Sequence, residues 1–263
     1  MNYLNNRSYR NVENLKNFNK NNIKKYYRNK LKSSDKHIDF IRKKIIKNNW
    51  KVNICEIGSG NGKLLYRLEK ENMIFNGIGF EISKSRCKFS EKFKKFINSK
   101  KIKIENKNFL NSKLKNGSFD LMIGVDIVFN LIAANSKKEA KKVLSLSKKY
   151  LKKGGTIVLE VSPFNKELSL LQDKKNYKKI VKFSPSDPYR NCIQKYKKIK
   201  KNLYIHKKFT DKNGNSSSFS NLVLPIKKSY WKKLKDWNVK IYDYWNKKND
   251  TDENEYIVVL KKK

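Results

Sequence analysis

Arginine is scarce in this strongly basic chain of 263 residues. Of its 64 basic residues only seven are arginine and 57 are lysine, which against 23 acidic residues gives a formal net charge of +41. Such an excess attracts polyanions, but bidentate contacts to phosphates and bases favour arginine. Asn and Ile are also abundant, so a bias toward A/T-rich codons explains the lysine content better than an evolved nucleic-acid surface. Binding of RNA through the Lys-rich surface remains the alternative.

Cysteine and histidine are rare as well. The three cysteines, Cys55, Cys87 and Cys192, are too few and too far apart for a disulfide framework, which fits a reducing compartment. With only His37 and His206 as histidines, we expect no metal site of the usual His/Cys kind.

Long apolar runs are absent too. None approaches the roughly 20 residues of a membrane span, and the first residues lack the apolar stretch of a secretory signal. We therefore expect a cytoplasmic protein without membrane contact. The sequence does not indicate its oligomeric state.

Short apolar runs alternate with amphipathic helical patterns between residues 51 and 162. This alternation is typical of an α/β fold with a mainly parallel sheet and helices on both faces. We expect helices in 63–72, 83–100 and 136–151, and strands in 52–57, 73–82, 101–106, 156–161 and at the start of 119–129.

Three further regions flank this core. Residues 1–50 are polar and predict an N-terminal helical extension, with isoleucines at helical spacing in 35–49. Residues 163–226 are rich in Tyr and Phe and predict an inserted cap. In 227–263 we expect a short helix, 227–236, and two closing strands, around 238–244 and 255–261.

The cap contains a strong turn signal. Asn213-Gly214 separates two extended stretches, 192–210 and 216–226. The pattern predicts an antiparallel β-ribbon.

A glycine-rich loop, EIGSGNG at 56–62, follows the first strand and leads into a helix. Glycine adopts positive φ and leaves room for a ligand beside the backbone, and ligands of doubly wound sheets bind at the carboxyl ends of the strands. A dinucleotide fold seats pyrophosphate on GxGxxG. Here Glu56, two residues before the first glycine, would repel pyrophosphate but suits a ligand with an amino group and a sulfonium. A tight structural turn is the alternative.

The segment from about 50 to 162 resembles the class I S-adenosylmethionine-dependent methyltransferases, with the glycine loop as their first motif. The resemblance implies S-adenosylmethionine as cofactor and a Rossmann-like, seven-stranded, mainly parallel sheet, with the ribbon cap inserted after strand five. It also implies that Glu81, at the end of the second strand, accepts hydrogen bonds from both ribose hydroxyls. The expected cofactor-binding residues are Glu56, Gly58, Ser59, Gly60, Asn61, Gly62, Glu81, Ile82, Asn108, Phe109 and Asp126.

Asn108 departs from the family pattern, and Asp126 is also a candidate for catalysis. Asn108 stands where family members often carry Asp near the adenine, and an ordinary loop turn explains it equally well. Asp126 follows the fourth strand, which in the family ends near the transferred methyl. Methyl transfer depends mainly on alignment in a site shielded from water, and a base is needed only if the acceptor loses a proton. Asp126 is the preferred catalytic candidate, and the other candidates for a base are His206, Tyr189, Tyr196, His37 and Tyr27.

The acceptor is less well defined. Residues 125–130 lack the prolines that follow the fourth strand in nucleic-acid amino-methyltransferases, and no Cys pair supports the cytosine-C5 route. An aromatic cap favours a small-molecule acceptor, and the alternative for most of these aromatic residues is that they form a small second core. Arg190 is expected to pair with an anionic group of that acceptor, with Tyr189 and His206 as further contacts. An RNA methyltransferase is the second hypothesis. A nonenzymatic binding module is the third, which the intact glycine loop and Glu81 disfavour.

Overall fold

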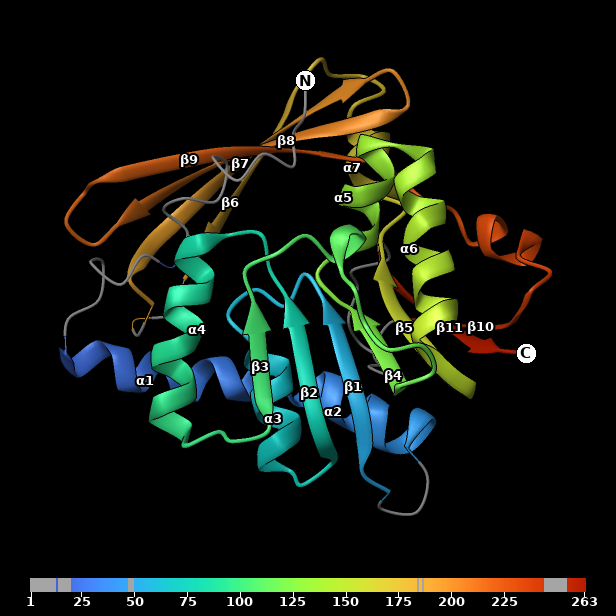
Figure 1. The fold of residues 1–263 in the computed structure, drawn as a ribbon. Coiled ribbons are helices and arrows are strands. Elements are labelled where there is room, and N and C mark those ends of the chain that lie inside the picture. Colours follow the sequence, from blue (N-terminus) through green and yellow to red (C-terminus); the bar gives the residue numbers. More distant parts are fainter. Residues whose placement is uncertain (1–12, 14–19, 47–49, 184, 186, 244–254) are drawn as a thin grey trace.

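The computed structural model describes residue 13 and residues 20–46, 50–183, 185, 187–243 and 255–263. Their strands form two sheets, one of seven strands in the order β10-β11-β5-β4-β1-β2-β3 and one of four in the order β6-β7-β8-β9. The seven-stranded sheet confirms the predicted α/β fold class. The four-stranded sheet, which we call the cap sheet, lies over the carboxyl ends of the parallel strands (Figure 1).

Five strands of the large sheet are parallel, and β11 lies antiparallel between β5 and β10. Most central positions are buried on both faces, as expected for a sheet covered by helices on either side. The strands are β1 Val52–Ile57, β2 Ile74–Phe80, β3 Ile102–Glu105, β4 Phe119–Gly124, β5 Leu151–Val161, β10 Trp237–Asp243 and β11 Tyr256–Lys262. Position 244 of the expected closing strand lies outside the described residues.

Helices cover both faces of this sheet. One face packs on α1 Lys20–Lys32, α2 Asp35–Phe40 with its π-helical continuation Ile41–Ile45, α3 Lys63–Lys70 and α4 Lys84–Ile97. The other packs on α5 Val128–Asn135, α6 Lys137–Tyr150 and the 3₁₀ turns Phe109–Asn111 and Lys228–Lys233. The short helices α5 and α7 (Asn165–Leu170) were not predicted, and the expected helix 227–236 is the second 3₁₀ turn. Within the described ranges, no helix has the length and apolarity that a membrane crossing requires.

The cap sheet is larger than the predicted ribbon. Its strands are β6 Tyr177–Lys182, β7 Tyr189–Ile199, β8 Asn202–Asp211 and β9 Ser216–Val223. The turn at Asn213-Gly214 joins β8 to β9 as predicted, but 192–210 is two strands rather than one. The chain reverses at Lys200, which adopts a left-handed φ of 53°. This turn escaped prediction because neither Lys200 nor Lys201 is a typical turn residue.

One side chain joins the two sheets. Asn130 of α5 is fully buried, and its Nδ2 donates to the carbonyl oxygens of Ser162 and Leu224, each at 2.7 Å. Its Oδ1 accepts from the Ser162 N–H at 3.1 Å. Ser162 follows β5 and Leu224 follows β9, so this amide ties the end of the cap sheet to the central sheet.

We predict that Asn130→Leu destabilises the protein by about 2–4 kcal/mol, because two carbonyls and one N–H lose their partner in a buried site. Urea unfolding measures the change. Asn135→Ala, at the exposed end of the same helix, should change stability by less than about 0.5 kcal/mol. Equal effects of the two variants would contradict this role of Asn130.

Candidate active site

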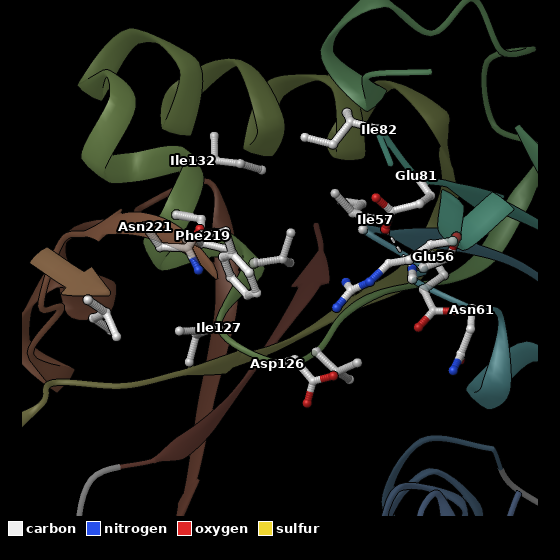
Figure 2. A pocket seen from close by; sticks show the side chains of 18 of the residues that line it. Glu56, Ile57, Asn61, Glu81, Ile82, Asp126, Ile127, Ile132, Phe219 and Asn221 are labelled. Atoms are coloured by element: carbon white, nitrogen blue, oxygen red, sulfur yellow. Dashed lines mark hydrogen bonds between the residues drawn. The ribbon is translucent and has the colours of Figure 1, made fainter. Parts of the chain in front are cut away.

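A pocket of about 500 Å³ lies between the two sheets, a size typical of small-ligand sites. One wall, the core wall, comes from the loops that follow β1, β2 and β4. The opposite wall, the cap wall, comes from the cap sheet. Figure 2 shows Phe219 and Asn221 of β9 across the pocket from Glu56, Asn61 and Glu81.

The glycine loop forms part of the core wall. Gly58, Gly60 and Gly62 have φ values of +68°, +57° and +77°, a conformation that side chains rarely adopt. A Cβ on Gly58 would lie 2.6 Å from Val128 Cγ2, and one on Gly62 would lie 2.7 Å from Tyr66 Cε2. A Cβ on Gly60 would meet only Arg86, at 3.7 Å. The outer glycines therefore allow close packing, whereas Gly60 keeps the backbone open to the pocket.

Two glutamates flank this loop. Glu56 is buried, and its Oε2 has no hydrogen-bond partner among the described residues; the same holds for Ser59 Oγ. Burial raises the pKa of Glu56 well above 4.5, against the attraction of Lys63. Glu81 accepts from Gly60 N–H at 2.8 Å and from Ser83 N–H at 2.7 Å. The loop thus presents buried carboxylate oxygens that suit a cationic or hydroxyl-bearing ligand.

Asp126 lies on a strained turn after β4. It and Ile127 both have left-handed φ values, 53° and 58°, and its N–H donates to Glu160 Oε2 at 2.6 Å. The Lys63 ammonium lies 3.7 Å from Asp126 Oδ2 and holds the pKa of this carboxyl well below its ordinary value. The Asp126 side chain is 73% exposed. The carboxylate is therefore ionised at neutral pH and faces the pocket.

The far end of the core wall is apolar. Phe109 is buried against Phe80 and Tyr150, with ring centroids 5.6 and 6.3 Å apart. Asn108 accepts from Leu110 N–H at 3.0 Å through its carbonyl oxygen. This bond caps the 3₁₀ turn, so a contact with adenine would have to share that oxygen.

The structure gathers most of the sequence-predicted cofactor residues at this pocket. Gly62 is the exception, since it packs against Tyr66 and does not line the pocket. The predicted residues that line the pocket are Glu56, Gly58, Ser59, Gly60, Asn61, Glu81, Ile82, Asn108, Phe109 and Asp126.

The predicted acceptor contacts are not brought to the pocket. Tyr189 is buried against Phe209, and Arg190 is exposed. His206 lies between two pocket-lining residues of β8 and so points to the other face of the strand, with Nδ1 3.0 Å from Ser220 Oγ. The expected roles of Tyr189, Arg190 and His206 therefore have no support in this geometry. Strand alternation explains the position of His206, whereas Tyr189 and Arg190 lie at a register shift of β7.

Of the other base candidates, one lines the pocket and two do not. His37 is buried beneath the Asp126 turn, 4.0 Å from Glu160, and Tyr27 is stacked on Phe93 in the core. Neither lines the pocket, whereas Tyr196 does.

Several lining residues were missed. Glu13, with a φ of 55°, accepts from Tyr26 OH at 2.7 Å and from Asn61 Nδ2 at 2.8 Å. Nothing in the sequence marks this long-range contact. Lys207 and Phe219 of the cap wall follow from strand alternation, but only once the pairing of β7, β8 and β9 is known.

We predict that Gly79→Ala displaces the glycine loop, because the added Cβ would lie 2.5 Å from Ser59 Oγ and 2.6 Å from Ile104 Cδ1. Overpacking of this kind lowers stability by about 1–3 kcal/mol, measured by thermal unfolding. Asn76→Ala, at an exposed position of the same strand, is the control. A variant with unchanged stability would show that this close packing is not required.

Comparison with known proteins agrees with this architecture. A family model described as "Methyltransferase domain" matches residues 48–247. No curated protein matches the chain.

Solved structures with the same fold cover most of the chain. An S-adenosylmethionine-dependent methyltransferase from Clostridium acetobutylicum ATCC 824 has a TM-score of 0.70 at 18% identity, over 90% of this chain and 96% of that one. The CcbJ methyltransferase from Streptomyces caelestis has a TM-score of 0.65 at 13% identity, over 80% and 83%. The glycopeptide N-methyltransferase MtfA, solved with S-adenosyl-L-homocysteine, has a TM-score of 0.56 at 9% identity, over 88% and 89%. The chain thus belongs to the methyltransferase domain family, with the Rossmann-like fold of the class I enzymes.

Proposed function

We propose that this protein transfers a methyl group from S-adenosylmethionine to a small-molecule acceptor held beneath the cap sheet. The observation that carries the proposal is the pocket itself, which joins the glycine loop and its two glutamates to a wall of the cap sheet that includes Tyr196 and Phe219. The family and the fold support methyl transfer in general, and the choice of a small acceptor is ours.

The core wall fits S-adenosylmethionine. The open backbone at Gly60 leaves room for the amino-acid part, and the unpartnered oxygens of Glu56 and Ser59 can accept from its amino group. Glu81 retains acceptor capacity for ribose hydroxyls beside its two backbone bonds. Phe109 and Ile82 supply an apolar surface for the adenine. The cofactor, when bound, supplies an activated methyl on a sulfonium.

The protein's own contribution is then alignment and shielding. The acceptor would lie between the core and cap walls, where the cap sheet limits access of water to the reacting atoms. Asp126 stays ionised beside Lys63 and could take a proton from an acceptor hydroxyl or amine. Tyr196 is the other sequence-predicted base candidate with a place in this pocket.

A pocket with a wall opposite the glycine loop favours a small acceptor over RNA. A strand of RNA needs an open groove along which phosphates can be contacted, whereas here the cap sheet forms the wall opposite the cofactor loop. The lysine surface nevertheless keeps RNA as the alternative. Addition of bulk RNA across a salt series separates the two, since an RNA enzyme would bind with a steep salt dependence.

We predict that S-adenosylmethionine binds the wild-type protein with micromolar affinity, on the order of 1–100 μM, and that Gly60→Asp abolishes binding. Asp tolerates a left-handed φ, and the site around Gly60 has room for a Cβ, so the fold should survive while the side chain occupies the ligand's place. Calorimetry measures binding.

Gly117→Asp is the matched control, since Gly117 has a φ of +61° and no atom within 4 Å of an added Cβ. Binding that persists in Gly60→Asp, or is absent from the wild type, would contradict the proposed site.

We also predict that cofactor affinity rises with pH. Burial raises the pKa of Glu56 in the free protein, and a bound ammonium and sulfonium favour its ionised form. Binding therefore releases a proton, and affinity falls by up to about tenfold for each pH unit below the raised pKa. Calorimetry from about pH 5 to about pH 8 tests this slope. In Glu56→Gln affinity should be lower and the slope lost; an unchanged slope would exclude Glu56 as its source.

A further inference from the structure

The cap wall has a regular composition that the sheet pairing explains. Lys179, Gln194, Lys207 and Phe219 are paired in register across β6, β7, β8 and β9, and all four line the pocket. The next rung on the same face carries Tyr196, Ile205 and Asn221, which also line it. These seven residues form one continuous surface of the cap sheet.

The charges on the two walls are opposite. Glu56, Glu81 and Asp126 lie on the core wall, whereas none of the seven cap residues is acidic. Two cations beside the glycine loop are already matched, since Lys63 lies 3.7 Å from Asp126 and Arg86 lies 3.9 Å from Glu13. Lys30 and Lys107 also line the pocket, outside the cap sheet. Among the described residues, neither Lys179 nor Lys207 has an ion-pair partner. The cap wall therefore carries positive charge that the described part of the protein does not neutralise.

Lys207 also differs from its neighbours in burial. The other lysines of β7 and β8, namely Lys195, Lys197, Lys198 and Lys208, are exposed, whereas Lys207 is half-buried in the pocket. A general enrichment in lysine explains the exposed lysines of these strands. It does not explain why the Lys207 side chain lies in the pocket.

The electrostatic environment of Lys207 agrees with this position. Burial lowers its pKa, while Arg86 and Asp126 of the opposite wall act on it in opposing directions. Desolvating an ammonium without a counter-ion is unfavourable. A bound anion would remove that cost.

We propose that Lys207, with Lys179 at the rim, binds an anionic group of the methyl acceptor, a carboxylate or a phosphate, while the acceptor's apolar body packs against Phe219 and Tyr196. On one rung and two strands apart, the two lysine Cα atoms are about 10 Å from each other, so both ammonium groups can reach one anion. Phe219 follows Lys207 on the same rung and Tyr196 lies on the next, which suits a flat ring beside the anion. The identification of the ligand as the methyl acceptor rests on the proposed function. The preference of this wall for an anion does not.

Aromatic anions and their neutral analogues test the inference. We would titrate the full-length protein with 4-hydroxybenzoate, phenyl phosphate and neutral 4-hydroxybenzamide by calorimetry, with and without saturating S-adenosyl-L-homocysteine. At least one anion should bind about tenfold or more tightly than the amide, and Lys207→Gln should weaken it by about tenfold or more. Lys208→Gln, on the opposite face of β8, should leave its affinity within about twofold. The anion that binds more tightly shows whether the site prefers a carboxylate or a phosphate.

Equal binding of the amide and both anions, absence of anion binding, or equal effects of Lys207→Gln and Lys208→Gln would overturn the proposal. S-adenosyl-L-homocysteine binding should be unchanged in Lys207→Gln, which shows that the pocket is intact. Failure of the wild type to bind S-adenosyl-L-homocysteine would instead contradict the proposed function, while the anion preference measured without it would still decide the role of Lys207.

Discussion

The turn from β1 into α3 is the constraint on which the rest of the site depends. Its left-handed glycines bring the backbone against Val128 of α5 and Tyr66 of α3, closer than any side chain would allow. Ser59 packs onto Gly79 of β2, and Gly60 N–H reaches the carboxylate of Glu81. One turn thereby fixes the relative positions of two helices, the neighbouring strand and the acid at its end. All of these contacts depend on the left-handed backbone of the same turn.

Each of the two sheets supplies one wall of the pocket. The central sheet supplies a cofactor wall with buried carboxylates, and the cap sheet supplies a wall of aromatic side chains and unmatched lysines. Asn130 links them, because its side-chain amide bonds to the ends of β5 and β9. Backbone bonds from Leu224 N–H to the Asn130 carbonyl and from Ile226 N–H to the Ser162 carbonyl join the same ends. A shift at this junction would change the distance between the walls, so an acceptor and a cofactor could be aligned only while the junction holds.

Local sequence predicted the core well and the cap poorly. Strands β1 to β5 and helices α3, α4 and α6 are each marked by their own periodicity, and the glycine loop is marked by spacing. The cap depends on non-local pairing. Without the turn at Lys200 the register of β7 and β8 is unknown, and with it the face on which each side chain lies. For this reason Arg190 was chosen as the anion partner on residue type, whereas the structure turns Lys207 into the pocket. Glu13 carries no local signal, because its partner Asn61 is 48 residues away.

In the proposed function, one pocket holds the cofactor on the glycine loop and the acceptor on the cap sheet. A crystal structure with S-adenosyl-L-homocysteine tests it most directly. We expect the ribose hydroxyls within hydrogen-bond reach of Glu81, the amino group near Glu56 and Ser59, and the sulfur facing the cap wall at Phe219 and Lys207. A nucleoside bound elsewhere, or a sulfur directed away from the cap sheet, would contradict it.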